Sequence, residues 1–197
     1  MKLEFANIRD MVEIQARRYA DRIAIRYYER DITYRQLDER SNRVANGLLK
    51  LGVRKGDRVC ILMDNSPEFY EAYFGIIKIG AIAGPVNCWW QTGEIQYLLN
   101  DSGAVALFFD HAYRGHVDKV LDGTPTLKHL VEREATDDRF LKFETLHGEA
   151  AELAPVGIDL DDVATIVYTS GTTGNPNGVL LTHRNILTNS WQASLLA

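Results

Sequence analysis

The chain has 197 residues, 46% of them hydrophobic and 25% charged, and its formal net charge is −5. This is enough apolar material for one sizeable core, and the mildly acidic balance argues against a nucleic-acid partner. No apolar run approaches the roughly 18 residues of a transmembrane segment, and the N-terminus lacks a secretory signal. Cys60 and Cys88 are expected to be buried, reduced thiols, so we expect a cytoplasmic protein.

Two helices and a hairpin are predicted over residues 7–52. Asn7 can cap the first helix. The apolar face of this helix would be formed by Ile8, Met11 and Ile14. Two short strands are expected on either side of 29–31. Thr33 and Gln36 then match a capping box, which would begin the second helix.

From residue 57 onward, strands and helices alternate. Continuous apolar runs at 57–63, 81–86 and 104–109 have the length of strands that are buried on both faces. Between these runs, Ser66 and Thr92 are placed to cap two further helices. This alternation predicts an α/β fold with a mostly parallel sheet flanked by helices.

The pattern weakens over 110–160, which we expect to be a surface excursion of the same α/β subdomain (residues 1–160) and not a second domain. Only 129–132 and 140–146 resemble short elements there. Over 161–197 the sequence predicts a strand, a loop, a short strand and a helix that begins near Thr182. The buried stripe of this helix would consist of Ile186, Leu187, Trp191 and Leu195.

The loop after this strand has the most specific composition, YTSGTTGNPNGV over residues 168–179. Gly171 and Gly174 permit positive φ, so that backbone N–H groups can converge on one anion. Hydroxyl donors are added by Thr169, Ser170, Thr172 and Thr173. Together these groups suit a polyphosphate held by neutral donors. A Walker-type loop is ruled out by spacing, because no Gly-Lys-Ser/Thr opens a helix here and Pro176 favours a turn into a strand.

The longer string YTSGTTGNPNGVLLTHRN closely resembles the signature loop of the adenylate-forming enzymes, which include acyl-CoA synthetases, peptide-synthetase adenylation domains and luciferases. The family pattern is Tyr/Phe-Thr-Ser-Gly-Thr-Thr-Gly-x-Pro-Lys-Gly-Val. The stretches 33–87 and 94–104 are similar to the N-terminal region of acyl-CoA synthetases. The resemblance therefore covers roughly 25–197.

This resemblance implies an enzyme that uses ATP and Mg²⁺ to convert a carboxylic acid, expected to be a fatty acid, into an acyl-adenylate. The acyl group would then pass to coenzyme A. The resemblance also implies that the loop embraces the β- and γ-phosphates. The nucleotide would be bound by Thr169, Ser170, Gly171, Thr172, Thr173, Gly174 and Asn177. Thr169 is in addition the candidate metal-binding hydroxyl, since Mg²⁺ prefers oxygen ligands. No catalytic residue is assigned within the chain.

The chain departs from the family pattern at Asn177, where the family has lysine. An amide offers a dipole in place of a full charge, and the loss of a charge-assisted hydrogen bond costs on the order of 1.5–3 kcal/mol. Either phosphate binding is weakened, or the loop backbone and the metal supply enough. In the family, the adenine motifs and the lysine of the C-terminal domain follow such a loop. We therefore expect residues 1–197 to be an N-terminal fragment of the large domain, inactive by itself.

Other polar and aromatic residues receive structural interpretations. His183 is expected to orient the loop and not to transfer a proton, and Asp161 and Asp162 to lie in a solvated turn. The histidines at 111, 116, 129 and 147 lack the spacing of zinc ligands. Trp89 and Trp90 follow a strand end, where ligands often approach α/β sheets. We expect one ring in the core and the other over the helix at 94, and the alternative is a surface that faces a partner.

Three functions remain open at this point. The chain is part of an acyl-CoA synthetase, of an adenylation enzyme with a carrier-protein acceptor, or of a non-catalytic binding or interaction module. The continuous resemblance over 33–103 favours the first. The sequence does not specify which acid is used or the oligomeric state, for which a homodimer is one option.

Overall fold

The structure is a computed structural model, and it describes residues 4–169 and 176–194. The helices are α1 (Ile8–Arg18), α2 (Tyr34–Lys50), α3 (Pro67–Lys78), α4 (Thr92–Asp101), α5 (Arg114–Val120) and α6 (His183–Ser194). The strands are β1 (Ile23–Tyr27), β2 (Arg30–Thr33), β3 (Arg58–Leu62), β4 (Ile82–Pro85), β5 (Ala106–Asp110), β6 (His129–Arg133), β7 (Leu141–Lys142), β8 (Val163–Thr169) and β9 (Asn177–Thr182). Three short 3-10 helices are η1 (His111–Tyr113), η2 (Leu121–Gly123) and η3 (Phe143–Gly148).

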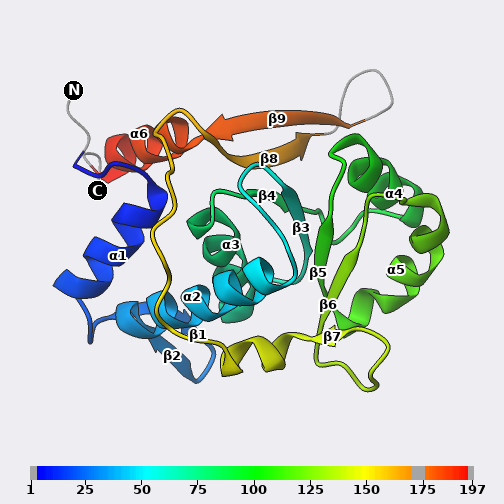
Figure 1. Ribbon diagram of the computed structural model, residues 1–197, viewed down its shortest axis with the longest axis horizontal. Coiled ribbons are helices and arrows are strands. Elements are labelled where there is room, and N and C mark those ends of the chain that lie inside the picture. Colours follow the sequence, from blue (N-terminus) through cyan, green and yellow to red (C-terminus); the bar gives the residue numbers. More distant parts are fainter. Residues whose placement is uncertain (1–3, 170–175, 195–197) are drawn as a thin grey trace.

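Strands β3 to β9 form one sheet in the order β7-β6-β5-β3-β4-β8-β9, and β1 and β2 form a separate hairpin. The strands from β7 to β8 in this order pair in parallel, whereas β9 runs antiparallel to β8. Helices α2 and α3 cover one face of the sheet, and α4 and α5 cover the other (Figure 1). The predicted α/β fold with a mostly parallel, helix-flanked sheet is therefore confirmed.

The central strand β3 contributes to apolar clusters on both faces of the sheet. Val59 and Ile61 pack on the side of α2 and α3, and Cys60 and Leu62 pack on the side of α4 and α5. This division follows from the alternation of side chains along a strand. All four side chains are fully buried. The continuous apolar run at 57–63 is thus the consequence of a strand that is covered on both faces.

Most of the predicted helix caps are present. Asn7 caps α1, the Thr33 capping box begins α2, and Ser66 caps α3. The prediction for α4 is wrong by one position, because the N-cap residue is Gln91 and not Thr92, and the Gln91 N–H donates to Oε2 of Glu94 at 2.8 Å. A glutamine at the cap position is outside the usual set of capping residues, so the sequence rule selected the neighbouring threonine.

The segment 110–160 is not wholly a surface excursion, and that expectation needs correction. The two predicted short elements are present, but β6 pairs in parallel with β5 along its whole length. Val131 and Glu132 of β6 are fully buried, and Phe143 of η3 packs in the cluster below α2. A charged residue such as Glu132 is usually exposed, so the sequence did not indicate that this strand is buried. Its carboxylate can be buried because it is paired with Arg114 of α5.

Two predicted helix faces also differ from the structure. In α1 the buried residues are Ile8, Val12 and Ala16. Met11 and Ile14 are only partly buried, because α1 packs against α2 and α3 through the adjacent stripe. In α6 Leu187 is buried as predicted, but Trp191 is 42% exposed, and Leu195 lies outside the described residues.

The two cysteines are both free, and their environments differ. Cys60 is fully buried, and this burial raises the pKa of its thiol to about 12. Cys88 is only half-buried, so the expectation of two buried thiols holds for one of them. Across residues 4–169 and 176–194, no helix combines the length and the hydropathy that crossing a membrane requires.

Candidate functional site

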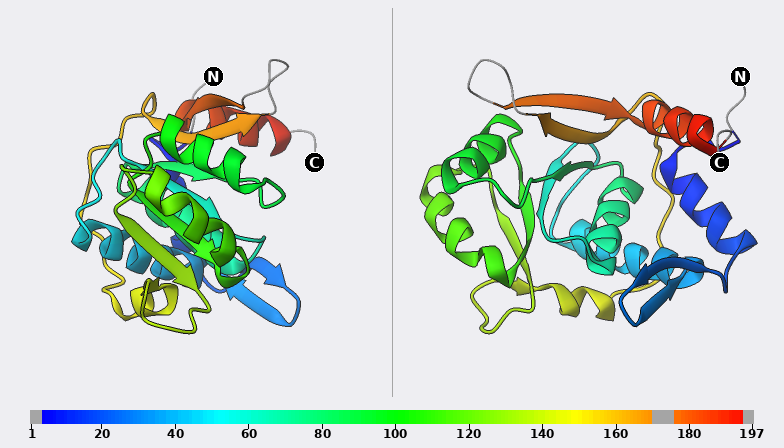
Figure 2. Two further views of the ribbon diagram at one scale, coloured as in Figure 1. Left: turned by 90° about the vertical axis from the view of Figure 1, so that its right-hand side faces the viewer. Right: turned by 180° about the vertical axis from the view of Figure 1, so that it is seen from behind.

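The predicted phosphate-binding loop joins the two strands of the β8–β9 hairpin, which runs along one side of the molecule beyond β4 (Figures 1 and 2). The described residues do not include Ser170, Gly171, Thr172, Thr173 and Gly174. The two predicted ligand-binding residues on either side of this gap are described. Thr169 ends β8 and Asn177 begins β9, and the two form the last cross-strand pair of the hairpin. Both side chains are exposed, so they are accessible to a ligand.

The end of β8 is held in place by Tyr168. Its hydroxyl donates a 2.6 Å hydrogen bond to Oδ2 of Asp101, the last residue of α4. The Tyr168 side chain is only 8% exposed, and burial together with this hydrogen bond raises the pKa of the phenol. The hydroxyl therefore stays protonated at neutral pH and keeps donating. This anchor fixes the residue directly before Thr169.

Gly178 lies opposite Tyr168 in the hairpin. A Cβ atom at position 178 would come within 2.9 Å of Cδ1 of Ile166 and 3.0 Å of Cζ of Tyr168. Ile166 and Tyr168 would have to shift to admit this Cβ atom, so glycine lets the Tyr168 ring lie against the β9 backbone without that shift. The sequence contains glycine at position 178, but it does not show that Ile166 and Tyr168 lie beside it.

The start of β8 is joined to the parallel sheet through one residue pair, Ala83 with Thr165. The Thr165 side chain is 3% exposed, and its hydroxyl donates a 2.6 Å hydrogen bond to the carbonyl oxygen of Ala83. A buried hydroxyl with a partner stabilises this junction, whereas an unpaired one would be costly. The hairpin is thus connected to β4 at one end and to α4 at the other.

The strand β9 leads directly into α6, as predicted. Thr182 and Asn185 form a reciprocal cap: Oδ1 of Asn185 accepts the Thr182 N–H at 2.9 Å, and Oγ1 of Thr182 accepts the Asn185 N–H at 3.2 Å. Two donors of the first helical turn are satisfied in this way. The predicted start of the helix near Thr182 is confirmed.

His183, the first residue of α6, is 1% exposed. Its Nδ1 atom accepts the backbone N–H of Ile8, the first residue of α1, at 3.1 Å. Burial lowers the pKa of the imidazole, so the ring is neutral at pH 7 and its proton is on Nε2. The contact that the structure describes is therefore with α1. A role of His183 in orienting the loop stays a prediction.

The carboxylates of Asp161 and Asp162, directly before β8, pair with different basic side chains. Asp161 accepts two hydrogen bonds from Arg184, at 2.6 and 2.7 Å, and Asp162 lies 2.6 Å from Nζ of Lys55. These hydrogen bonds lower the pKa of both carboxyl groups. The turn that was predicted here is confirmed, and its acidic residues join β8 to α6 and to the loop before β3.

The two tryptophans differ in burial. Trp90 packs against the cluster on the α4–α5 side, as expected for one of the rings. Trp89 is 90% exposed, so the expectation that the second ring covers α4 is wrong. The backbone N–H of Trp89 donates to Oδ1 of Asn87 at 2.9 Å, and this local turn directs the side chain away from the core.

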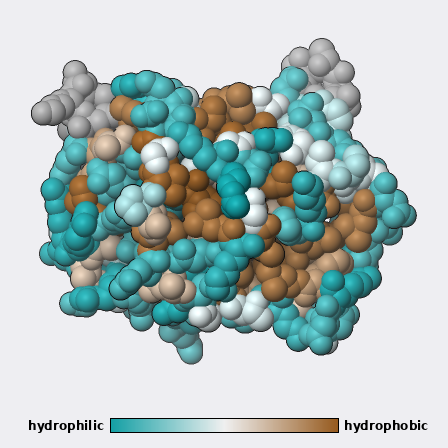
Figure 3. Space-filling model, in the orientation of Figure 1, coloured by the Kyte–Doolittle hydropathy of each residue, from teal (hydrophilic) through white to brown (hydrophobic). Residues whose placement is uncertain are grey.

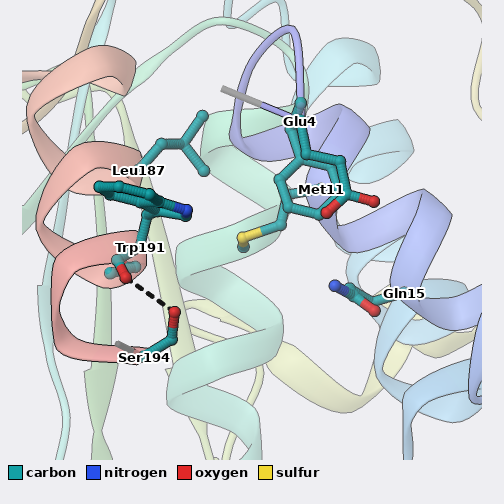
Figure 4. Close-up of a pocket in the computed structure, with 8 residues that line it drawn as sticks. Glu4, Met11, Gln15, Leu187, Trp191 and Ser194 are labelled. Carbon is teal, nitrogen blue, oxygen red and sulfur yellow. Dashed lines mark hydrogen bonds between the residues drawn. The ribbon is translucent and has the colours of Figure 1, made fainter. Parts of the chain in front are cut away.

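A hollow of about 270 Å³ lies between α1 and α6. Figure 4 shows Met11 and Gln15 of α1 on one side and Leu187 and Trp191 of α6 on the other. Within the described residues, Oε1 of Gln15 is buried without a hydrogen-bond partner. Of the predicted phosphate-binding residues, Thr169 and Asn177 are described, and neither of them lines this hollow.

Comparison with known proteins gives a consistent assignment. The model of the family "AMP-binding enzyme" matches residues 12–196. The chain is 40% identical to the 3-hydroxybenzoate–CoA/4-hydroxybenzoate–CoA ligase of Thauera aromatica, over 81% of this chain and 31% of that protein. It is 38% identical to the 3-oxocholest-4-en-26-oate–CoA ligase of Rhodococcus rhodochrous, over 91% of this chain and 34% of that protein.

Among solved structures, an anthranilate CoA ligase, AuaEII, in complex with anthranoyl-AMP superposes with a TM-score of 0.88 at 30% identity. The similarity covers 93% of this chain and 36% of the ligase. The chain thus spans about a third of the length of the relatives that it matches. Since the family model covers nearly all of the sequence and the fold agrees, the chain belongs to the AMP-binding enzyme family.

Proposed function

We propose that the protein serves the ATP-dependent activation of a carboxylic acid and its ligation to coenzyme A. A carboxylate oxygen attacks the α-phosphorus of ATP, the bond to the β-phosphate oxygen breaks, and acyl-adenylate and pyrophosphate form. The thiol of coenzyme A then takes the acyl group and releases AMP. Membership of the family and the names of the relatives, which are CoA ligases, support this proposal.

The proposal concerns a reaction of the longer enzyme, because residues 1–197 correspond to about a third of each relative. We assign these residues to the N-terminal part of its large domain, with an α/β subdomain over 1–160 followed by the strand, loop and helix of 161–197. For the 197-residue chain alone we expect no pyrophosphate exchange. Exchange at a rate above the background of an unrelated protein would contradict this expectation.

The observation that carries the proposal is the anchored β8–β9 hairpin. Thr169 and Asn177 are exposed and paired, and Tyr168 is tied to α4 directly before them. The two ends of the intervening segment are therefore held together before any ligand arrives, which reduces the entropy that binding must remove. We assign polyphosphate binding to Thr169, Ser170, Gly171, Thr172, Thr173, Gly174 and Asn177.

The described ends of the hairpin suit such a ligand. The Thr169 hydroxyl is an oxygen ligand of the kind that Mg²⁺ prefers, and the Asn177 amide can donate to a phosphate oxygen. When bound, Mg²⁺ would neutralise charge on the phosphates. The protein side chains position the polyphosphate and stabilise the negative charge that moves onto the leaving group, and they take no proton.

Binding of Mg·ATP to the 197-residue chain tests this assignment by equilibrium dialysis. The substitution Asn177→Lys adds a charge-assisted hydrogen bond and should tighten binding about 10- to 100-fold. Asn189→Lys adds the same charge on the exposed side of α6 and is the matched control. Thr169→Val, which has nearly the same shape, should weaken the Mg²⁺-dependent part of binding.

The outcomes distinguish the effect of Asn177 from the assignment of the phosphate loop. If Asn177→Lys and Asn189→Lys bind Mg·ATP with equal affinity, then the hypothesis that asparagine at position 177 weakens phosphate binding is wrong. If neither Asn177→Lys nor Thr169→Val changes the affinity of a chain that does bind Mg·ATP, the nucleotide binds elsewhere and the phosphate-loop assignment is wrong.

The acid and the setting of the reaction are finer proposals. A fatty acid remains our prediction, and the names of the relatives also include aromatic and steroid acids. The free thiols support a cytoplasmic setting. In the full-length enzyme, release of AMP that depends on coenzyme A favours a CoA ligase, whereas pyrophosphate exchange without a CoA-dependent step favours a carrier-protein acceptor. A homodimer remains a prediction, which sedimentation analysis can test.

A further inference from the structure

Residues 149–158 form an extended segment between η3 and the turn before β8, and we call this segment the strap. It crosses α2 and passes α1 on its way to β8 (Figure 1). Within the described residues, only the N–H of Glu149 among the main-chain groups of the strap bonds to another main-chain group. Ile158 is the one strap residue that is buried. The strap is therefore held neither by a strand ladder nor by a continuous core.

The first half of the strap is held by three side chains of α2, which are those of Asn42, Arg43 and Asn46. They donate to the carbonyl oxygens of four consecutive residues, Glu149, Ala150, Ala151 and Glu152. Asn46 makes two of these bonds, at 2.7 and 2.8 Å. Asn46 lies three and four residues after the other two donors, so all three share one face of the helix. This face of α2 thus binds an extended peptide through its main chain.

The second half of the strap is held in the same way from the start of α1 and from the loop before β3. The donors are Asn7, Arg9 and Lys55, at distances of 2.9–3.1 Å. The acceptors are again carbonyl oxygens, those of Leu153, Ala154, Gly157 and Ile158. Because these bonds go to main-chain atoms, they depend little on the side chains of the strap itself.

The face of α2 is held in its binding arrangement from the side away from the strap. Oδ1 of Asn42 accepts a 2.7 Å hydrogen bond from Nζ of Lys78, a fully buried lysine that also bonds to Asp38 at 2.6 Å. Since the oxygen of the Asn42 amide takes this bond, its N–H₂ group is directed at the strap. The donors are therefore positioned by the core of the protein and not by the strap.

The far end of the strap leads into the β8–β9–α6 arm, which contains the predicted phosphate loop. The carbonyl of Leu160 accepts the N–H of Arg184 at 2.8 Å, and the carbonyl of Asp162 accepts the N–H of His183 at 3.1 Å. Both donors lie in the first turn of α6. β8 itself meets the parallel sheet at a single residue pair. The strap is consequently joined to α6 as directly as to the sheet.

We propose that the strap detaches and rebinds as one unit while α2 and the sheet stay folded, and that its binding restrains the start of α6. Several of its bonds are solvent-exposed, including both bonds of Asn46 and that of Lys55, so water can replace either partner when the strap leaves. Segments with little burial and exposed hydrogen bonds are those that open below the global free energy of unfolding. None of the predicted phosphate-binding residues takes part in this opening.

Cleavage of the folded 197-residue chain by a glutamate-specific protease tests the proposal, with mass spectrometry to identify cuts after Glu149 and Glu152. Asn46→Ala removes two of the bonds that hold the strap, and it does not weaken α2, because alanine is the better helix former. It should raise the rate of cleavage at both sites about 5- to 100-fold, since this rate follows the population of the open form.

Asn100→Ala is the matched control. The Asn100 amide donates to a main-chain carbonyl in the same way, that of Gly123 at 2.8 Å, but it lies on α4 and does not contact the strap. This variant should be cleaved after Glu149 and Glu152 at the rate of the unaltered chain.

Hydrogen exchange at the N–H of Arg184 tests whether the strap opens as one unit, because this group bonds to Leu160, beyond the end of the strap that Asn46 does not contact. Asn46→Ala should raise its exchange rate several-fold and leave the amides of β3 unchanged. Equal cleavage of Asn46→Ala and the unaltered chain would overturn the proposal. Faster cleavage with unchanged exchange at Arg184 would also overturn it, since only local fraying would remain, and so would faster exchange throughout β3, since the whole chain would then unfold.

Discussion

The parallel centre of the sheet and the β8–β9–α6 arm both contain runs of apolar residues, yet they bury them to very different extents. In β3 the side chains from Val59 to Leu62 are fully buried. In β9 Val179 is 45% and Leu180 is 56% exposed. Figure 3 shows that hydrophobic residues also reach the surface in the middle of one face of the molecule. An apolar run is therefore a core only where elements cover it on both sides.

The two regions also differ in how they are attached. The centre is joined by long parallel ladders, such as the pairing of β5 with β6. The arm is held by individual polar contacts, which include Tyr168 with Asp101 and His183 with Ile8. Burial is cooperative, whereas single hydrogen bonds contribute about 0.5–1.5 kcal/mol each. Substitutions in the centre of the sheet should consequently lower the free energy of unfolding by more than substitutions in the arm.

The largest effect is expected for Phe108→Ala in β5. The Phe108 ring is fully buried and packs edge-on against Phe143, at a centroid distance of 5.8 Å. Its removal should lower the free energy of unfolding by about 3–5 kcal/mol. The matched change in the arm, Leu180→Ala, should alter it by less than about 0.5 kcal/mol. Urea unfolding followed by circular dichroism measures both, and equal losses would contradict the comparison.

His183→Ala should have an intermediate effect. It leaves the buried N–H of Ile8 without an acceptor, which costs about 1–3 kcal/mol. The variant His183→Asn can keep an acceptor near the position of Nδ1 and should lose less. Unfolding at pH 7.5 compares the three proteins, and the same stability for His183→Ala and the unaltered chain would show that the contact to α1 contributes nothing.

The same residue predicts a dependence on pH. Burial lowers the pKa of His183 in the folded protein below the value of 6.5 that it has when exposed. As the pH falls below 6.5, the unfolded chain takes up this proton first, so the free energy of unfolding decreases through that window. Above 6.5 the group is neutral in both states and has no effect. Unfolding curves between pH 5 and 7.5 should be flatter for His183→Asn, and parallel curves would contradict this assignment.

Tyr168→Phe should have a smaller effect on stability than Phe108→Ala or His183→Ala, because it removes one hydrogen bond and leaves the ring in place. The expected loss is about 0.5–1.5 kcal/mol. The matched change Tyr97→Phe removes the hydroxyl of a half-buried tyrosine of the same helix α4 that holds Asp101. If only Tyr168→Phe also weakens the binding of Mg·ATP, then the anchor contributes to the geometry of the loop ends.

Local sequence rules predicted the fold class and most of the elements. Thr33 with Gln36, and Ser66, identified helix starts because a cap is a contact within one turn. They failed at Gln91, whose side chain is not a usual cap, and they missed the burial of Glu132 in β6. For Glu132 the pairing of its carboxylate with Arg114, and not the residue type, decided the outcome.

For the candidate site, the sequence predicted that residues 169–177 form a ligand-binding loop, and it marked the departure at Asn177. It did not predict that Tyr168 reaches Asp101, since this contact joins residues 67 positions apart, or that position 178 faces the Tyr168 ring across the hairpin. Trp89 stood out as an aromatic residue at a strand end, but its exposure depended on the turn at Asn87.

The sequence by itself determined the order of the elements, the parallel character of the sheet and the composition of the loop, because caps, periodicity and turn residues act over a few positions. Only the tertiary structure decided which apolar runs are covered, where the loop ends are anchored, and that the strap lies along α2. Those features depend on residues that are not neighbours in the sequence, such as Tyr168 and Asp101, which are 67 positions apart, and no local pattern records which partner lies opposite.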